Sequence, residues 1–547
     1  MTENNQREKE RAELYKTLWA FANDVRGQVD GWDFKAYVLT LLFYRYVSEY
    51  MERIVDENEH ASGRTNFSYA ELDDETAEKI RDAMVKRCGY FIRPSQLFRN
   101  VRKTARGNEN LNDDVAKAFR DVEDSTKGTP SEEDFKGLFS DMDPNSPKLG
   151  SKPSERRERL TRLLDVIGSM NFGTYGEGTT DLFGDAYEYL MGMYASSAGK
   201  SGGEYYTPPE VSRLLMELAT AGGNEISSIY DPACGSGSLL LQAKKILSKK
   251  YGPDSDEVRR IKFFGQEKNL TTYNLCRMNL VLHGVRYDKM DVRCGDTLTN
   301  PAPAHDASRP FDAVVSNPPY SLKWRNDGMN DVNRLNDERF APAGILAPKS
   351  YADMAFVLHC LSWISESGTA AMVCFPGVMY RGGAEQKIRK YLVDGNYVHA
   401  VIRMPENLFY GTTVPVNLLI MKKNKPTDEV LFIDASNEKV KVTNANKLTE
   451  ENMRTILGWY EDAKPVPHRV AVVGRDEIEK EKYSLSVSTY VEQEDDREKV
   501  DVDVLNAELD AIVARSNELR AKINEIVSDL SSDVDLFGTK EKKGEEA

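Results

Sequence analysis

The sequence predicts an α/β fold: a doubly wound, Rossmann-like sheet with an N-terminal helical domain before it and a coiled-coil-like helix after it. Three observations support this prediction. Between residues 226 and 422, short apolar runs of strand length alternate with longer amphipathic segments. Before residue 122, apolar residues recur at helical spacing, and near the end of the chain they recur in a heptad pattern. The 547 residues suffice for more than one core.

The helical domain and its linker are predicted to cover residues 1–155. Residues three or four positions apart predict a first helix that includes Leu14, Leu18, Phe21, Ala22 and Val25. A second apolar stretch, at residues 34–50, predicts a core helix. Residues 123–157 are rich in Asp, Pro, Ser and Lys, so we expect a loop or hinge there, with a short helix at 135–139.

The sheet domain is predicted to cover residues 156–480. It should begin with a helix at 181–194 and a glycine-rich loop at 199–204, followed by a helix whose N-terminus is marked by Thr207, two prolines and Glu210 and which runs to residue 219. We then expect strands at 226–231, 262–267, 292–296, 312–316, 370–375, 398–404 and 416–422, with helices at 239–249, 272–283, 353–366 and 384–394. In such a sheet, ligands bind at the carboxyl ends of the strands.

Two further segments have their own patterns. Residues 321–350 have little periodicity, and a loop of that length inside a domain is usually functional or mobile. The last predicted region, 481–547, holds a heptad helix at 505–530 that needs a partner helix from this chain or another, and a disordered tail. The seam consists of Leu505, Leu509, Ile512, Ser516, Leu519, Ile523, Ile526 and Leu530.

The composition limits the possible partners and the compartment. With 73 basic and 88 acidic residues the net charge is −15, whereas a protein that grips DNA alone usually has a basic balance. A local basic surface or a partner must therefore supply the positive charge that binds DNA. Six scattered cysteines without a C-x-x-C pair predict reduced thiols and no structural zinc. The polar start and the shortness of the apolar runs predict a cytoplasmic protein that does not interact with a membrane.

The turn Asn317-Pro318-Pro319-Tyr320 follows the predicted strand at 312–316. An amide oxygen and a proline carbonyl at this point can accept both N–H bonds of an exocyclic amine, and the tyrosine can stack on a flat heterocycle. An ordinary proline turn is the alternative.

A second ligand would occupy the neighbouring strand ends. Gly235 and Gly237, which follow Asp231, allow a ligand to approach the backbone, although Leu240 stands where a dinucleotide fingerprint has its third glycine. Glu267, about 30 residues further along, can hold two ribose hydroxyls. Asp296, after the third strand, can accept a hydrogen bond from an adenine amine or cap a turn.

Together with Gly203-Glu-Tyr-Tyr-Thr-Pro208, these motifs resemble gamma-class, S-adenosylmethionine-dependent DNA adenine-N6 methyltransferases, and more narrowly the modification (M) subunit of type I restriction-modification systems. The resemblance implies DNA as substrate, a specificity subunit shared by two M subunits, and an association with a restriction (nuclease) subunit that stays open. The implied catalytic residues are Asn317, Pro318, Pro319 and Tyr320. The implied cofactor-binding residues are Glu204, Tyr205, Tyr206, Thr207, Pro208, Pro209, Asp231, Gly235, Ser236, Gly237, Glu267 and Asp296.

The expected mechanism begins with an adenine flipped out of the duplex. Tyr320 stacks on it, while Asn317 Oδ1 and the Pro318 carbonyl accept its two N6–H bonds. Methyl transfer is then a direct displacement that needs neither a metal nor a covalent intermediate.

Three alternatives remain open: a protein glutamine methyltransferase, which could use the same pocket, a self-contained DNA methyltransferase, and a degenerate cofactor-binding scaffold. Phe409 could add a second stacking face or belong to the core.

Overall fold

The computed structural model describes residues 12–18, 31–172, 180–197, 207–222, 225–252, 255–301, 310–324, 330–409, 412–442, 445–494 and 502–533. The chain divides into two compact units, residues 1–492 and residues 493–547. Each unit is described by itself. No helix within the described residues is both long enough and apolar enough to cross a membrane.

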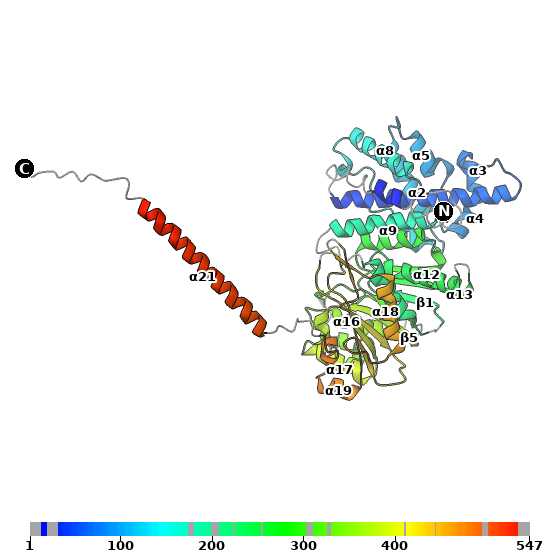
Figure 1. The fold of residues 1–547 in the computed structure, drawn as a ribbon. Helices are drawn as coiled ribbons and strands as arrows, with labels where there is room; N and C mark the ends of the chain where they lie inside the picture. The colour runs from blue at the N-terminus through cyan, green and yellow to red at the C-terminus, as the bar shows by residue number, and fades with distance from the viewer. Residues whose placement is uncertain are drawn as a thin grey trace, which may run out of the picture. The chain divides into compact units, whose positions relative to one another are not determined.

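The first part of the larger unit is helical, as predicted. Its longest helix, α2 (Gly31–Ala61), packs against α5 (Phe98–Thr104), α8 (Pro153–Ser169) and α9 (Thr180–Ser197) (Figure 1). Aromatic rings fill the core between them: Tyr44 meets Phe119 edge-on at 5.3 Å, and Phe119 stacks on Phe139 at 4.5 Å. Residues 12–18 are also helical, whereas Phe21, Ala22 and Val25 lie outside the described residues. The shorter elements are η1 (Tyr69–Glu71), α3 (Asp74–Ala77), η2 (Glu78–Ile80), α4 (Arg81–Cys88), η3 (Pro94–Gln96), α6 (Leu111–Asp124), α7 (Glu132–Phe135) and η4 (Pro147–Leu149).

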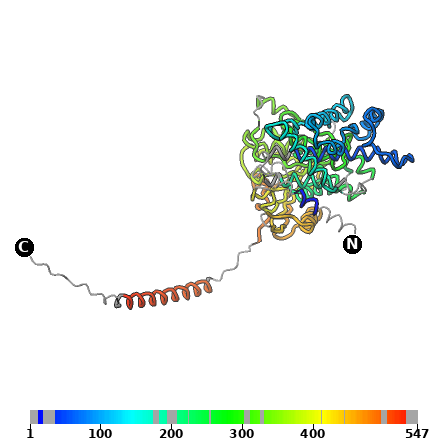
Figure 2. The backbone as a smooth tube through the Cα atoms, turned by 90° about the horizontal axis from the view of Figure 1, so that it is seen from above, coloured from blue at the N-terminus to red at the C-terminus, as the bar shows by residue number. Residues whose placement is uncertain are grey.

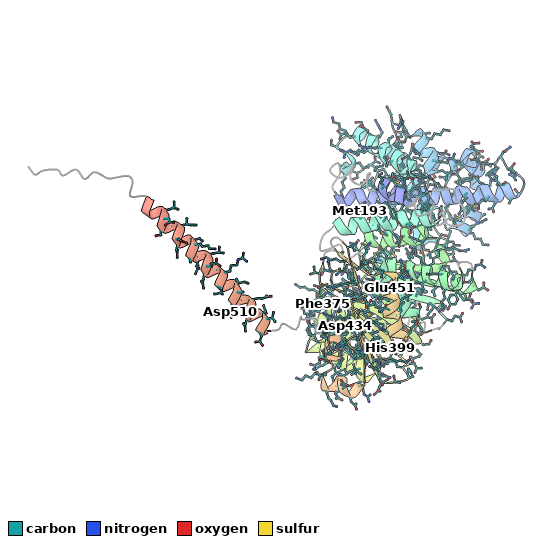
Figure 3. The ribbon with its side chains drawn as sticks, viewed as in Figure 1. Met193, Phe375, His399, Asp434, Glu451 and Asp510 are labelled. Carbon is teal, nitrogen blue, oxygen red and sulfur yellow. The ribbon has the colours of Figure 1, made fainter. Side chains whose placement is uncertain are left out.

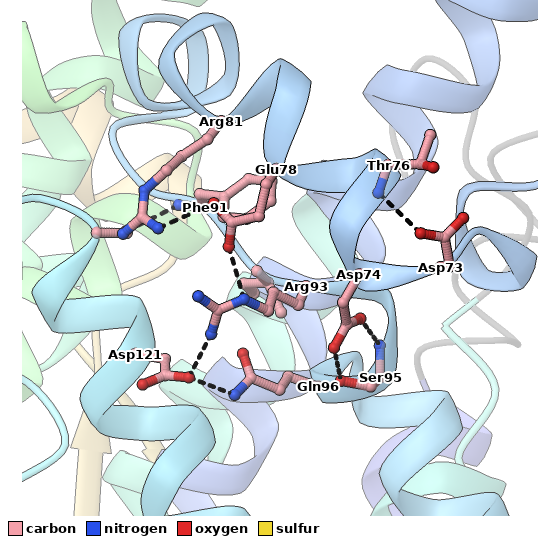
Figure 4. Close-up of polar contacts among 12 residues, drawn as sticks. Asp73, Asp74, Thr76, Glu78, Arg81, Phe91, Arg93, Ser95, Gln96 and Asp121 are labelled. Atoms are coloured by element: carbon pink, nitrogen blue, oxygen red, sulfur yellow. Dashed lines mark hydrogen bonds and ion pairs between the residues drawn. The ribbon is translucent and has the colours of Figure 1, made fainter.

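A polar network joins these short helices at the surface (Figure 4). Arg93 donates to Glu78 and to Asp121, each at 2.6 Å, and Gln96 donates to the same oxygen of Asp121. Because one guanidinium serves two carboxylates from different helices, the network holds η2, η3 and α6 together.

The segment predicted as a loop or hinge, residues 123–157, is irregular but tightly packed. Its short helix is α7, which ends at Phe135, where the predicted helix at 135–139 begins. The fully buried Arg277 donates to the carbonyls of Glu133, Asp134 and Lys136 at 3.0–3.1 Å. The irregular backbone confirms the predicted loop, a buried guanidinium from the sheet domain holds part of it, and its role as a hinge stays a prediction.

A nine-stranded sheet forms the second part of the larger unit and confirms the predicted doubly wound fold. Its order is β11-β8-β6-β7-β5-β4-β1-β2-β3. Strands β3, β2, β1, β4 and β5 are parallel, β7 is antiparallel to β5 and to β6, and β11 is antiparallel to β8. The strands are β1 (Ser228–Asp231), β2 (Lys262–Glu267), β3 (Met290–Cys294), β4 (Phe311–Ser316), β5 (Ile364–Cys374), β6 (Val398–Arg403), β7 (Asn417–Lys422), β8 (Val430–Asp434) and β11 (Val470–Val473).

Helices cover both faces of this sheet. Along β4, Ala313 and Val315 belong to one apolar core and Val314 to the other, because alternate side chains point to opposite faces. The first core includes side chains of α11 (Pro209–Thr220), α12 (Ser238–Tyr251), α14 (Leu270–Leu282) and α18 (Glu450–Asp462), and the second includes side chains of α16 (Asp353–Trp363) and α17 (Ala384–Asp394). The predicted helix at 353–366 ends early, at Trp363, where β5 begins.

The chain after residue 425 extends the sheet by β8 and β11, which the sequence patterns did not predict. It also contains a separate two-stranded sheet of β9 (Val440–Val442) and β10 (Ala445–Lys447). Two short helices, α19 (Arg475–Lys480) and α20 (Val487–Tyr490), follow β11, and another short helix, α13 (Asp256–Arg260), lies earlier in the chain before β2.

The smaller unit contains one helix, α21 (Val502–Asp533), which confirms the predicted heptad helix (Figure 2). Side chains 503–530 are all exposed and stand out along the whole helix in Figure 3. Among the described residues of this unit, no second helix occurs that could pair with the seam. The tail from residue 538 lies outside the described residues.

Candidate active site

The predicted motifs converge at the point where the strand order reverses. Strand β1 has β2 on one side and β4 on the other, so the turns after β1 and β4 leave the same edge of the sheet. A crevice at the carboxyl ends of two such strands is where doubly wound sheets bind ligands.

Asp231 joins these two turns. Its Oδ1 accepts hydrogen bonds from the Ala233 N–H and the Ser316 hydroxyl, each at 3.0 Å. Its side chain is completely buried, and Oδ2 has no hydrogen-bond partner. Burial raises the pKa of Asp231 to about 7. An unsatisfied buried carboxylate oxygen is costly, so this atom fits a ligand that brings a donor.

The glycine turn leads from β1 into α12. Gly235 has φ 53° and Gly237 has φ 79°, a region that favours glycine. A Cβ on Gly237 would lie 2.8 Å from Cys276 Sγ, so this position also lacks room for a side chain. The Ser236 carbonyl accepts a hydrogen bond from Asn279 at 2.9 Å, which fixes the turn from below.

Glu267, at the end of β2, supports the same turn. One carboxylate oxygen accepts from the Gly235 N–H at 3.1 Å and the other from the Asn269 N–H at 2.8 Å. Burial raises the pKa of Glu267, and these hydrogen bonds oppose the shift. Each oxygen keeps a second lone pair, so the carboxylate can still accept from two neighbouring hydroxyls.

Asp296 mainly shapes its own turn. Its Oδ1 accepts from the Leu298 N–H at 3.0 Å, and its Oδ2 pairs with Lys268 at 2.9 Å. The turn is tied to the glycine loop because Thr297 donates its hydroxyl to the Pro232 carbonyl. The turn is one of the two roles that the sequence left open for Asp296, and the hydrogen bond to an adenine amine stays a prediction.

Asn317 is oriented by a residue 110 positions away. Its Nδ2 donates to Thr207 Oγ1 at 3.0 Å, and its Oδ1 accepts from the Tyr320 hydroxyl at 2.6 Å. The predicted helix N-terminus is confirmed: α11 begins at Pro209 with Pro208 in the cap position, and the Thr207 side chain contacts Asn317. In this orientation Nδ2 donates to Thr207, and Oδ1 is the acceptor of the amide.

Tyr320 is the last residue of the turn that follows β4, and its ring packs against the core on one face of the sheet. Burial raises its pKa well above the ordinary value, so its hydroxyl stays protonated and donates to Asn317. Its ring centre is 6.5 Å from that of Phe375, which Figure 3 labels. Ser321 follows with φ 54°, and its N–H is held by Asp353 at 3.1 Å.

The remaining predicted residues are three on the cofactor side and one aromatic residue on the target side. Glu204, Tyr205 and Tyr206 lie outside the described residues, so their roles stay predictions. Phe409 is buried in the core that covers one face of the sheet.

In its described parts, the segment at 321–350 is held at its two ends by backbone hydrogen bonds. The Trp324 N–H donates to the Lys349 carbonyl at 3.1 Å, and the Ala352 N–H donates to the Leu322 carbonyl at 2.9 Å. These two hydrogen bonds join the ends of the segment. The side chains of four of its residues are buried: Trp324, Arg334, Arg339 and Phe340. The sequence patterns missed the role of Arg339, and its one signal was the mixture of aromatic residues and arginines in an aperiodic segment.

One cluster of the described residues, outside the strand ends, has side chains of metal-binding type. Ligand atoms of Asp185, Glu188 and His283 lie within 4.8 Å of one another. Lys245 already brings a positive charge to Glu188 at 3.1 Å. We therefore assign no metal to this cluster.

The fold, with its glycine turn, buried carboxylate and oriented amide, fits one class of protein: the S-adenosylmethionine-dependent methyltransferases that act on an amine. A family model described as "N-6 DNA Methylase" matches residues 178–499, and one described as "HsdM N-terminal domain" matches residues 14–167. The chain belongs to the N-6 DNA methylase family, among the methylase subunits of type I restriction enzymes.

The relatives agree along the whole chain. The type I restriction enzyme MpnII methylase subunit of Mycoplasma pneumoniae is 43% identical and covers 97% of this chain and 98% of its own length. The crystal structure of a type I restriction-modification methyltransferase subunit from Streptococcus thermophilus is 34% identical, with a TM-score of 0.77, and covers 88% of this chain and 100% of its own. A structure from a study of type I complex assembly, 20% identical with a TM-score of 0.62, shows the same fold over 97% of this chain and 99% of its own.

Proposed function

We propose that Asn317 and Tyr320 hold a flipped-out adenine, so that the chain is a site-specific, adenine-specific DNA methyltransferase. Its reaction is the transfer of a methyl group from S-adenosylmethionine to N6 of adenine in DNA, as the methylase subunit of a type I complex. The observation that carries the site assignment is the orientation of the Asn317 amide at the end of β4, where Thr207 holds Nδ2 and leaves Oδ1 as the acceptor.

In this proposal, Asn317 Oδ1 and the Pro318 carbonyl accept the two N6–H bonds, which turns the nitrogen lone pair away from the ring. The Tyr320 hydroxyl uses one lone pair of Oδ1, and the second is available to the amine. The Tyr320 ring provides the stacking face that offsets part of the few kcal/mol needed to extrude the base.

The residues at the other strand ends fit the cofactor, which supplies an activated methyl group. Asp231 Oδ2, the buried acceptor without a partner, would take a hydrogen bond from the ammonium of the methionine part. Glu267 would hold the ribose hydroxyls, and the backbone at Gly235, Ser236 and Gly237 would line the pocket. We also assign Glu204, Tyr205, Tyr206 and Pro209 to the cofactor side, where aromatic faces suit a sulfonium cation.

Replacement of Asn317 by alanine tests the site. Because the amide acts on the target amine and not on the cofactor, Asn317→Ala should abolish tritium transfer from labelled cofactor to DNA while cofactor binding, measured by calorimetry, stays close to wild type. Asn437→Ala, at an exposed position after β8, is the matched control and should remain active. Methylation of DNA by Asn317→Ala at the wild-type rate would refute the assignment.

The same assay separates the alternatives. Label in a protein acceptor instead of DNA would favour a glutamine methyltransferase, and methylation by the isolated chain would favour a self-contained enzyme.

The assembly is the second part of the proposal. Two copies of this chain would flank one specificity subunit that reads the DNA sequence in the cytoplasm, and a restriction subunit could join them. The net charge of −15 supports a partner that supplies the grip on DNA, and the exposed heptad seam of α21 supports a helical contact with it.

A further inference from the structure

Arg339 is a buried arginine whose hydrogen bonds are all satisfied. Its five N–H donors reach Asp337 Oδ1, Asp337 Oδ2, the Thr297 carbonyl, the Leu298 carbonyl and His359 Nδ1, at 2.9, 2.6, 2.8, 3.0 and 3.2 Å. Burial alone would raise the pKa of Asp337, but the hydrogen bonds and charge of Arg339 bring that pKa below its ordinary value. The pair is therefore ionised, and its planar geometry is one that a lysine cannot reproduce.

The residues that accept hydrogen bonds from Arg339 belong to different elements around the proposed active site. Thr297 and Leu298 form the turn after β3, next to Asp296, and Thr297 in turn donates to Pro232 beside the glycine loop. Arg339 itself belongs to the segment at 321–350, which follows the Asn317 turn and whose ends are joined by backbone hydrogen bonds. One side chain thus connects the segment on the target side to the turn on the cofactor side.

His359 completes the connection. Since its Nδ1 accepts from Arg339, its Nε2 carries the proton and donates to the Tyr230 hydroxyl at 3.1 Å. Tyr230 directly precedes Asp231 in β1. The buried network therefore links the turn after β3 to β1, the strand that carries Asp231.

We propose that Arg339 is a positioning residue for the cofactor: it holds the turn at 295–298 in place from the target-side segment, so that cofactor affinity depends on its guanidinium. The proposal rests on the methyltransferase function described above. It adds a residue that contacts neither substrate and acts through the carbonyls of Thr297 and Leu298.

The test compares two buried arginines of the same segment by calorimetric titration of the full-length chain with S-adenosylmethionine. Arg339→Lys keeps the charge but cannot reach all the acceptors, so its Kd should rise about tenfold. Arg334→Lys is the matched control, because Arg334 is equally buried but lies over the Trp324 ring at 5.5 Å. The Kd of Arg334→Lys should stay within about twofold of the wild-type value, even if its Tm falls as much as that of Arg339→Lys.

Two outcomes would overturn the proposal: wild-type affinity in Arg339→Lys, or an equal loss of affinity in Arg334→Lys. If Arg339→Lys does not fold, Asp337→Asn takes its place. This variant keeps Arg339 but weakens the pair of hydrogen bonds between the Asp337 carboxylate and the guanidinium. Unchanged affinity in Asp337→Asn would then count against the proposal. Failure of the wild-type chain to bind the cofactor would instead contradict the methyltransferase function itself.

Discussion

At the scale of single residues, the site depends on which atom of each polar group is already occupied. Asn317 has its nitrogen on Thr207, and Asp231 has one oxygen on Ser316 and the other without a partner. These bonds distinguish an atom that shapes the site from an atom that is available to a substrate. Two predictions follow from that distinction.

The first concerns Thr207. Thr207→Val removes the acceptor for Asn317 Nδ2 while keeping the shape, so the amide loses its fixed orientation and kcat should fall about tenfold. Thr207→Ser keeps the hydroxyl and should retain most of the activity. Single-turnover methylation at saturating cofactor measures both variants, and equal rates for the valine and serine variants would contradict the orienting role.

The second concerns the pH dependence of cofactor binding. Burial raises the pKa of Asp231 to about 7, so below that pH the free protein holds a neutral carboxyl that cannot accept a hydrogen bond from an ammonium through its protonated oxygen. Affinity should therefore increase as the pH rises from about 6 to about 7.5. The same titration with Asp231→Asn should show a flat profile over this range, since the amide does not titrate there. A slope that persists in Asp231→Asn would mean that another group causes it.

At the scale of elements, α21 has the clearest consequence. Its seam is exposed along the whole helix, and a heptad seam is stable only when it packs against another helix. The neighbours Ile512 and Val513 offer a matched pair, since both are exposed and point about 100° apart around the helix.

We expect Ile512→Ser to weaken co-purification with the specificity subunit and Val513→Ser to affect it far less. Serine and the β-branched residues have similar helix propensities, so the helix itself should remain. Native mass spectrometry of the co-expressed subunits reports the outcome, and cofactor affinity should be unchanged in both variants. Intact assembly with Ile512→Ser would show that the seam is not the contact.

At the scale of the whole molecule, α14 unites the helical part and the sheet part of residues 1–492. Met278 and Leu282 of this helix belong to the helical core, whereas Cys276 and Leu280 belong to a core of the sheet. Helix α9, placed in the sheet domain by the predicted boundary at residue 155, also packs into the helical core. The predicted boundaries at residues 155 and 480 stay predictions, and the described contacts divide the chain only after residue 492.

Much of this architecture could be predicted because it depends on local patterns. The strands β2 and β4, the helix α17 and the heptad helix follow from apolar periodicity, and the order of glycine turn, Glu267 and Asn317 follows from the alternation of strands and helices. Strand β11, at the edge of the sheet, is short and only half buried, so its sequence signal is weak, whereas β8 lies inside the sheet with all five residues buried and was missed because so short an apolar run does not by itself distinguish a strand from a helix. The segment at 321–350, predicted to be functional or mobile, is held by partners of Trp324 and Arg339 that no local pattern reveals.

The sequence by itself determined the fold class, the family and the identity of the groups at each strand end, since these depend on residue type and spacing along the chain. Only the tertiary structure decided that Thr207 orients Asn317, that Asp231 has one oxygen to offer, and that Arg339 connects the two sides of the pocket. The physical reason is that hydrogen-bond partners such as Thr207 and Asn317, 110 residues apart, are chosen by the packing of whole elements. Periodicity describes which face a residue occupies, but it does not describe which distant atom it meets there.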